Sequence, residues 1–303
     1  MPILPSALFT RRTIATACVT GSLVLGPAAY GSHTPGPPAL GTPTSASASM
    51  PSGGNPSATP MPGMSPGNGL SAQQDGYTLT SPTATLPAGK AATYRFTITG
   101  PGGTPVTAFA LNQTRRLHFY VIRSDLTGFQ HLHPTMTGDG TWTAHLAPLQ
   151  PGHWRLFTQF TPDTGPGKGR DFVLSRTLTV PGTAATTALP PPSASTMVDG
   201  YTLTLRGNLK AGMMSPLTVT IRKDGKSVTD LQPYLDTYAH LTAFHQGDQA
   251  FAHLHPQTKA AGGHGGPTLD FMVGLPASGN WRLFLQFQTA GTLHTAAVTL
   301  HVR

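Results

Sequence analysis

The chain has 303 residues, including 35 glycines and 30 prolines, and its formal net charge at pH 7 is +8. After Arg11-Arg12, its basic residues are scattered singly apart from Arg115-Arg116 and Arg222-Lys223, which is typical of a solvated surface, so we expect no nucleic-acid partner. All 11 acidic residues are aspartate. The absence of glutamate, a strong helix former, together with the glycine, proline and threonine content predicts an all-β protein.

Residues 1–31 are predicted to be a secretory signal peptide. Arg11 and Arg12 precede an apolar stretch that is too short for a stable membrane span, and small residues around Ala28-Ala29 offer cleavage positions. General secretion and twin-arginine export both remain open as routes. No later apolar run approaches the roughly 18 residues of a membrane helix. We therefore expect a secreted or extracytoplasmic protein of the cell envelope, without an integral membrane span after signal cleavage.

The single cysteine, Cys18, lies inside this signal. A mature chain without thiols has no disulfide framework, no thiolate nucleophile and no thiolate metal ligand. Any metal would be held by histidine, methionine, aspartate or the backbone.

Residues 32–74 are predicted to be a disordered linker, because a run of Pro, Gly, Ser and Met buries too little apolar surface to offset its conformational entropy. It contains Met50-Pro51 and Met61-Pro62-Gly63-Met64. Thioethers suit Cu(I), so these methionines are either soft metal ligands or simple compositional drift.

Two repeats follow, predicted at residues 75–182 and 198–303, with a second linker at 183–197 around Pro190-Pro191-Pro192. Asp-Gly-Tyr-Thr-Leu-Thr opens both copies, at Asp75 and at Asp199, and a Trp-Arg-Leu-Phe run recurs at Trp154 and Trp281. Short alternating runs separated by Gly, Pro and Asp turns predict strands. Two domains of this length and pattern favour tandem immunoglobulin-like β-sandwiches.

Each repeat contains the same histidine pattern: His, twelve residues, His, one residue, His, Pro. The first copy is His118, His131 and His133 with Pro134, and the second is His240, His253 and His255 with Pro256. Neutral imidazole is the commonest protein ligand for borderline transition metals. These six histidines are the predicted metal ligands.

Strand parity gives this spacing a geometric meaning. Suppose that the strands carrying His118 and His131 form a hairpin around Ser124–Thr127. His131 and His133 follow His118 by odd numbers of residues, which places all three imidazoles on one face of the hairpin. The same spacing makes the same prediction for the second copy. A bulge at Gly128 or Gly247 would reverse the inference.

The sequence offers further candidates around each set of three imidazoles, which could converge on one ion at about 2.0–2.1 Å. His145, Met272 and His264 are possible extra ligands. Asp125 and Asp248 are possible hydrogen-bond partners of the ligating histidines.

The run from Leu117 to Pro134, with its His-Leu-His-Pro end, resembles secreted actinobacterial proteins of the YtkA-like group, and so do Tyr238–Phe244 and Ala252–Pro256. The resemblance covers residues 75–302 and implies an immunoglobulin-like sandwich in an exported protein associated with copper or heavy-metal handling. The CopC copper carriers have a similar sandwich but bind copper through the histidine at the mature N-terminus, a position that His33 would take only if cleavage followed Ser32.

The sequence supports two alternative functions. The first is a secreted or envelope metal-binding protein for sequestration or delivery of copper, or of zinc, with a three-histidine cluster in each repeat; its partners would be the metal ion and another envelope metal-handling protein. The second is a non-enzymatic structural or protein-interaction module of the envelope, in which the histidines are structural. We expect no enzyme, because no general base, carboxylate pair or phosphate-binding loop accompanies the histidines.

Overall fold

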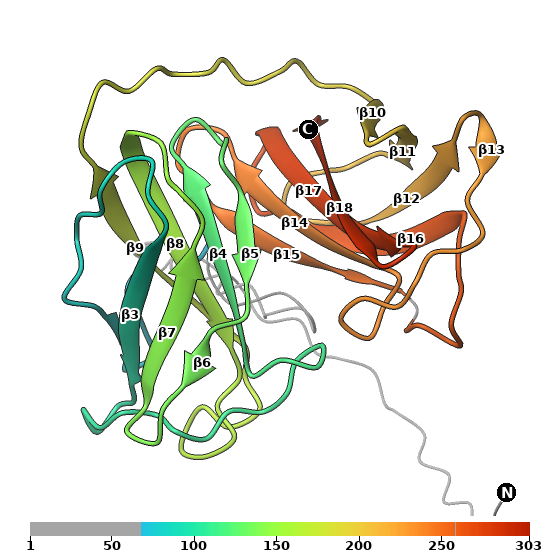
Figure 1. Ribbon diagram of the computed structural model, residues 1–303. Helices are drawn as coiled ribbons and strands as arrows, with labels where there is room; N and C mark the ends of the chain where they lie inside the picture. The colour runs from blue at the N-terminus through green and yellow to red at the C-terminus, as the bar shows by residue number, and fades with distance from the viewer. Residues whose placement is uncertain (1–67, 258) are drawn as a thin grey trace, which may run out of the picture. The chain divides into compact units, whose positions relative to one another are not determined.

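The protein is described by a computed structural model that covers residues 68–257 and 259–303, without the side chain of His255. The predicted signal peptide at 1–31 and the predicted linker up to residue 67 lie outside the described residues, as do Cys18, His33 and the linker methionines. The described residues form β-strands and turns only (Figure 1). Among them, no helix has the length and hydrophobicity that a membrane span requires. The fold is all-β, as predicted.

The first repeat is a sandwich of two antiparallel sheets. One sheet has the strand order β1-β2-β3-β7-β6, and the other has the order β5-β4-β8-β9. Its strands are β1 (Gln73–Gln74), β2 (Tyr77–Thr80), β3 (Ala92–Thr99), β4 (Leu117–Arg123), β5 (Gln130–Leu132), β6 (Thr135–Met136), β7 (Thr141–Leu146), β8 (Gly152–Phe160) and β9 (Phe172–Val180).

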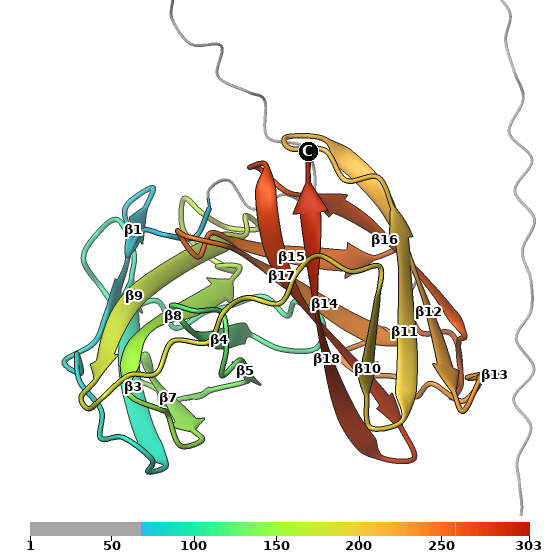
Figure 2. The ribbon, with the colours of Figure 1, turned by 90° about the horizontal axis from the view of Figure 1, so that it is seen from above.

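The second repeat has the same plan with one difference. Its two layers are joined through β15, so the strands form one continuous path, β10-β11-β12-β16-β15-β14-β17-β18, with β13 paired to β12. Its strands are β10 (Ser195–Val198), β11 (Tyr201–Gly207), β12 (Met214–Lys223), β13 (Lys226–Ser227), β14 (Ala239–His245), β15 (Phe251–Pro256), β16 (Thr268–Gly274), β17 (Gly279–Thr289) and β18 (Thr292–Val302). Figure 2 shows the connection from β9 to β10 as an extended segment.

Both repeats begin earlier than predicted, and the turn chemistry explains why. Asp75 and Asp199 have φ values of 48°, and the glycines that follow them, Gly76 and Gly200, have φ values of 81° and 80°. Two successive residues with positive φ form the hairpin turn that Asp-Gly sequences favour. The strand before each turn, β1 or β10, therefore pairs with the strand after it, although β1 and the first three residues of β10 lie in stretches predicted to be linkers.

Strand β4 shows how the sandwich positions the histidines, because it is buried on both faces. Leu117, Phe119 and Val121 point into the core between the two sheets of the first repeat. Tyr120 and Ile122, on the opposite face, belong to a separate apolar cluster. In an isolated sandwich this second face would meet water, so the burial of both faces means that another layer covers it.

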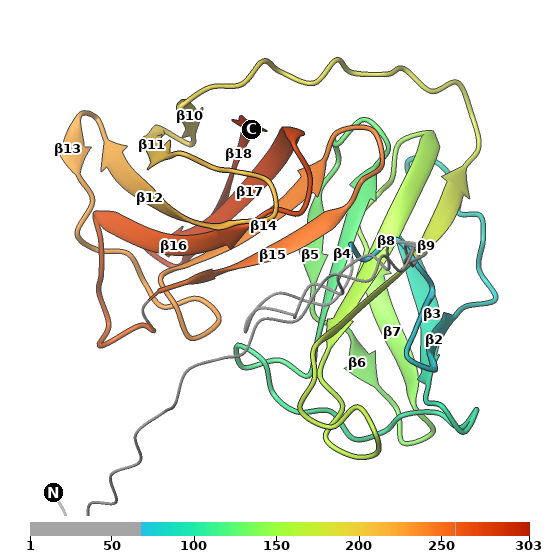
Figure 3. The same cartoon turned by 180° about the vertical axis from the view of Figure 1, so that it is seen from behind.

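The covering layer comes from the second repeat, since the described residues of both repeats belong to one compact unit. We call the apolar cluster between the repeats the interface cluster; it consists of Tyr120, Ile122, Leu126, Phe157 and Val173 with Phe244, Phe251 and Phe284. The rings of Phe157 and Phe251 stack with centroids 5.2 Å apart. Strands β4 and β8 thus pack against β14, β15 and β17 (Figure 3). Burying each large side chain here contributes about 1.5–3 kcal/mol.

Candidate metal centre

The His-Leu-His-Pro segment lies where the chain passes from one sheet to the other. In the first repeat, β5 pairs with β4, and β6, directly after Pro134, pairs with β7. In the second repeat, β15 pairs with β14 up to Leu254 and with β16 from His255 onward. Proline has no N–H to donate and keeps the preceding residue extended, which suits a point where pairing changes from one sheet to another. The two copies of the motif occupy equivalent corners.

The register between β4 and β5 agrees with the predicted parity. Tyr120 pairs with His131 and Phe119 with Leu132, so the pairing is regular at these positions. His118 Nδ1 lies 3.1 Å from His131 Nε2. One nitrogen from each of His118, His131 and His133 lies within 4.8 Å of the others. The first predicted triplet is therefore assembled in space, and metal ligation by it remains a prediction.

The second triplet does not stand apart from the first. His240 and His253 share a face of their own hairpin, with ring centroids 4.4 Å apart. The ring of His240 also stacks on His131 at 4.6 Å, and His253 lies 5.8 Å from His118. We call His118, His131, His133, His240 and His253 the histidine cluster. The side chain of His255 lies outside what the structure describes, so a separate site in the second repeat stays a prediction.

Two hydrogen bonds determine which ring nitrogens carry protons. His118 Nε2 donates to the backbone carbonyl of Asn112 at 3.0 Å. His131 Nδ1 donates to Oε1 of Gln286 at 2.7 Å. Both acceptors are oxygens that can only accept, and a neutral imidazole has one N–H. In their neutral forms, His118 Nδ1 and His131 Nε2 therefore face each other as two lone pairs.

Burial favours the neutral form of His131, His133 and His240. His118 and His240 are 0% and 1% exposed. Burial, followed by the proximity of His118 and His133, lowers the pKa of His131 well below its usual 6.5. Burial and the charges of His118 and Arg115 lower the pKa of His133 to about 3. Burial and the neighbouring histidines, His253 first, also lower the pKa of His240. Neutral imidazole is the protonation state that a metal ligand requires.

The other predicted candidates do not belong to the histidine cluster. His145 and His264 are exposed, and Met272 pairs along its backbone with His255. The expectation that Asp125 and Asp248 would support the ligands was wrong. Their carboxylates close the two hairpin turns instead, where short side chains satisfy free backbone N–H groups. Asp125 accepts from Arg123 and Thr127, and Asp248 accepts from His245 and the backbone N–H of Ala250.

The residues that support the histidine cluster are not among those predicted from the sequence. Gln286 and Tyr120 each hydrogen-bond a histidine of the other repeat, Tyr120 through its hydroxyl, 3.0 Å from His240 Nε2. One signal was available: the Trp-Arg-Leu-Phe run ends in Gln-Phe in both copies, at Gln159 and Gln286. Each glutamine pairs in register with the first histidine of its own repeat. Both are buried, which is unusual for glutamine.

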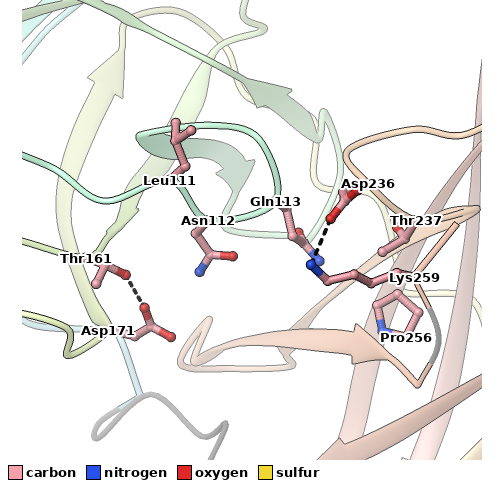
Figure 4. Close-up of a pocket in the computed structure, with 9 residues that line it drawn as sticks. All are labelled: Leu111, Asn112, Gln113, Thr161, Asp171, Asp236, Thr237, Pro256 and Lys259. Atoms are coloured by element: carbon pink, nitrogen blue, oxygen red, sulfur yellow. Dashed lines mark hydrogen bonds and ion pairs between the residues drawn. The ribbon is translucent and has the colours of Figure 1, made fainter. Parts of the chain in front are cut away.

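Residues of both repeats line a pocket of about 390 Å³ (Figure 4). Asn112 belongs to its wall, and the carbonyl of the same residue accepts the N–H of His118. On the facing side Asp236 forms an ion pair with Lys259 at 3.2 Å. Asn112 is thus the residue that links this pocket to His118.

Comparison with known proteins gives a family. The family described as "Domain of unknown function (DUF8832)" matches residues 72–174 and 196–303, once in each repeat. No curated protein matches the chain. Of the solved structures, the Escherichia coli adhesin FdeC is 16% identical with a TM-score of 0.26, over 76% of this chain and 65% of that chain.

Two further solved structures are similar at the same level. InvD of Yersinia pseudotuberculosis is 14% identical with a TM-score of 0.25, over 75% of this chain and 57% of that chain. Salmonella alpha-2-macroglobulin is 12% identical with a TM-score of 0.24, over 79% of this chain and 15% of that chain. The chain spans less than two thirds of each of these structures, and TM-scores this low carry no functional argument.

Proposed function

The chain belongs to the DUF8832 family, and we propose that it is a non-enzymatic metal-binding protein whose ion is held by His118, His131 and His133. Its role would be sequestration or delivery of copper, or of zinc, outside the cytoplasm. The partners would be the ion itself and a second metal-handling protein of the envelope that supplies or receives it.

The observation that carries this proposal is the pair of facing nitrogens, His118 Nδ1 and His131 Nε2, 3.1 Å apart. In a tetrahedral site with bonds of about 2.05 Å, two ligand nitrogens lie about 3.3 Å apart. Each ring also donates its other N–H to an oxygen, which is the outer hydrogen bond that ligating histidines usually make. A proton shared between the two nitrogens would create a buried imidazolium, which burial disfavours.

The donor set supports a borderline divalent ion. The third histidine of the set, His133, has a buried Nε2 without a hydrogen-bond partner among the described residues. Three imidazoles and no thiolate suit Zn(II) and Cu(II), and the order of affinities for nitrogen sites favours copper. Copper is therefore the cargo we propose first.

Calorimetric titration of the intact protein with Zn(II) and Cu(II) tests the proposal. We expect saturable binding that His131→Ala and His133→Ala abolish, since each removes one of three ligands. His145→Ala is the matched control, because His145 is exposed on β7 of the same repeat. Absence of binding by the intact protein, or binding unchanged in both ligand variants, refutes the proposal.

A second candidate is a structural or protein-interaction module of the envelope, in which the histidines hold the two repeats together through hydrogen bonds. The hydrogen bonds from His131 to Gln286 and from Tyr120 to His240 support it, since both join the repeats without a metal. This function predicts that the ligand variants lose stability while the intact protein binds neither metal. The same titration, combined with urea denaturation of each variant, separates the two candidates.

A further inference from the structure

We infer that the two repeats form one metal centre in which Gln286 of the second repeat is a positioning residue for His131 of the first, so that ion binding and association of the repeats are coupled. This inference rests on the proposed function and goes beyond it. The proposal above needs ligands from the first repeat only, whereas the inference makes the second repeat a part of the site.

The side-chain amide of Gln286 is held with its oxygen toward His131. It lies on β17, is 5% exposed, and its Nε2 donates to Thr295 Oγ1 at 3.3 Å. This contact turns Oε1 toward His131, where it accepts the Nδ1 proton. A neutral imidazole has a single proton, so a proton on Nδ1 leaves Nε2 free to bind an ion.

Loss of Gln286 would reverse the tautomer of His131. Without an acceptor at Nδ1, the proton is more stable on Nε2, where it donates to Nδ1 of His118 at the existing separation of 3.1 Å. That hydrogen bond would use the lone pair of His118 and cover Nε2 of His131. Two of the three ligand atoms would then be unavailable, although neither ligand had been changed.

The faces that meet across the interface carry other buried polar atoms without a hydrogen-bond partner among the described residues. They are Gln159 Oε1, Thr242 Oγ1 and His240 Nδ1. Gln159 pairs in register with His118, and Thr242 with His253, so these atoms lie on strand positions beside the histidine cluster. Each such atom destabilises the folded protein when it is left unsatisfied.

A hydrated cation between the repeats offers these atoms partners. Its positive charge attracts the lone pairs of the oxygen and imidazole nitrogen atoms, and its bound water can donate hydrogen bonds to them. Satisfying atoms of both repeats strengthens their association, and by linkage a stronger association raises the affinity for the ion. The hydrogen bond from His131 to Gln286 crosses the interface and so connects ion binding in the first repeat to the position of the second repeat.

The affinity test uses Gln286→Leu, which removes the acceptor, and Gln286→Glu, which keeps one. We expect Gln286→Leu to weaken Zn(II) and Cu(II) binding by about 10- to 100-fold, the usual effect of removing an outer hydrogen bond from a ligating histidine. Gln286→Glu should restore affinity to near that of the parent protein. Gln246→Leu, at an exposed glutamine of the same repeat, should change nothing.

Hydrogen exchange of the unmodified full chain, with and without Zn(II), tests the coupling without a variant that could misfold. Slower exchange in β14 and β17 as well as in β4 and β5 supports the inference. Protection confined to the first repeat, or Gln286→Leu with the affinity of the parent, overturns it and leaves the proposed function intact. Failure of the parent chain to bind either metal removes both.

Discussion

The hydroxyl of Tyr120 lies 3.0 Å from Nε2 of His240, and this buried hydrogen bond joins the two repeats. Tyr120 is completely buried and belongs to the interface cluster, while its hydroxyl reaches the histidine cluster. Burial raises the pKa of Tyr120 well above its usual 10, so the phenol keeps its proton. One side chain thus connects the apolar half of the interface to its polar half.

Tyr120→Phe tests the contribution of this bond to stability. The substitution keeps the ring in the interface cluster and removes only the hydroxyl, leaving His240 Nε2 buried without a partner. We expect a loss of about 1–3 kcal/mol in the free energy of unfolding, measured by urea denaturation. Tyr238→Phe is the control, since its hydroxyl bonds loop carbonyls in an exposed environment. Equal effects of the two changes would contradict the assignment.

The two hairpin glycines, Gly128 and Gly247, should respond differently to alanine. Both have positive φ, 69° and 104°. A Cβ at Gly128 would lie 2.3 Å from Cη2 of Trp154, whereas one at Gly247 meets no atom within 4 Å.

Gly128→Ala therefore adds a steric clash to the backbone strain and should cost about 2–4 kcal/mol, against about 1–2 kcal/mol for Gly247→Ala. Thermal and urea denaturation measure both. A ranking in the opposite order would show that the first hairpin is not packed against Trp154.

The apolar part of the interface should behave as a true core. Phe244 is completely buried and contacts the rings of Phe129, Phe157, Phe251 and Phe284. Phe244→Ala should destabilise the protein by about 3–5 kcal/mol, as for other large-to-small core changes. Leu293→Ala, at a side chain that is 41% exposed, should stay within about 0.5 kcal/mol. If Phe244→Ala is equally mild, the repeats do not depend on this packing.

Asp125 should produce an acid-sensitive step in stability. Burial would raise its pKa, but hydrogen bonds from Arg123, Thr127 and the backbone of Thr187 outweigh it and lower the pKa from 3.8 to about 2. Because the folded pKa is below the unfolded one, the stabilisation is fully present above about pH 4 and is lost as the pH falls toward 2.

Urea midpoints measured across this pH range should fall less steeply in Asp125→Asn than in the parent protein. Asp230→Asn, at an exposed position, should leave the slope unchanged. A parental slope in Asp125→Asn would show that other groups cause the acid sensitivity.

Much of the histidine geometry could be predicted from residue spacing. Side chains alternate along a strand, so the odd separations between His118, His131 and His133 place them on one face of any unbulged hairpin. The pairing of Tyr120 with His131 agrees with that parity. The first strand of each repeat is harder to predict, because the Asp-Gly sequences at Asp75 and Asp199 are compatible with a domain start as well as with the hairpin turn that they form.

The sequence by itself determined the all-β repeats, the hairpins and the shared face of each histidine set, because these follow from local alternation and turn chemistry. Only the tertiary structure decided that the outer faces of two sandwiches pack together, bringing His240 against His131. The partners Gln286 and His131 are 155 residues apart, and no local pattern encodes a contact at that distance. The burial of the histidine cluster, the tautomer of His131 and the contact between the two histidine sets all depend on that packing.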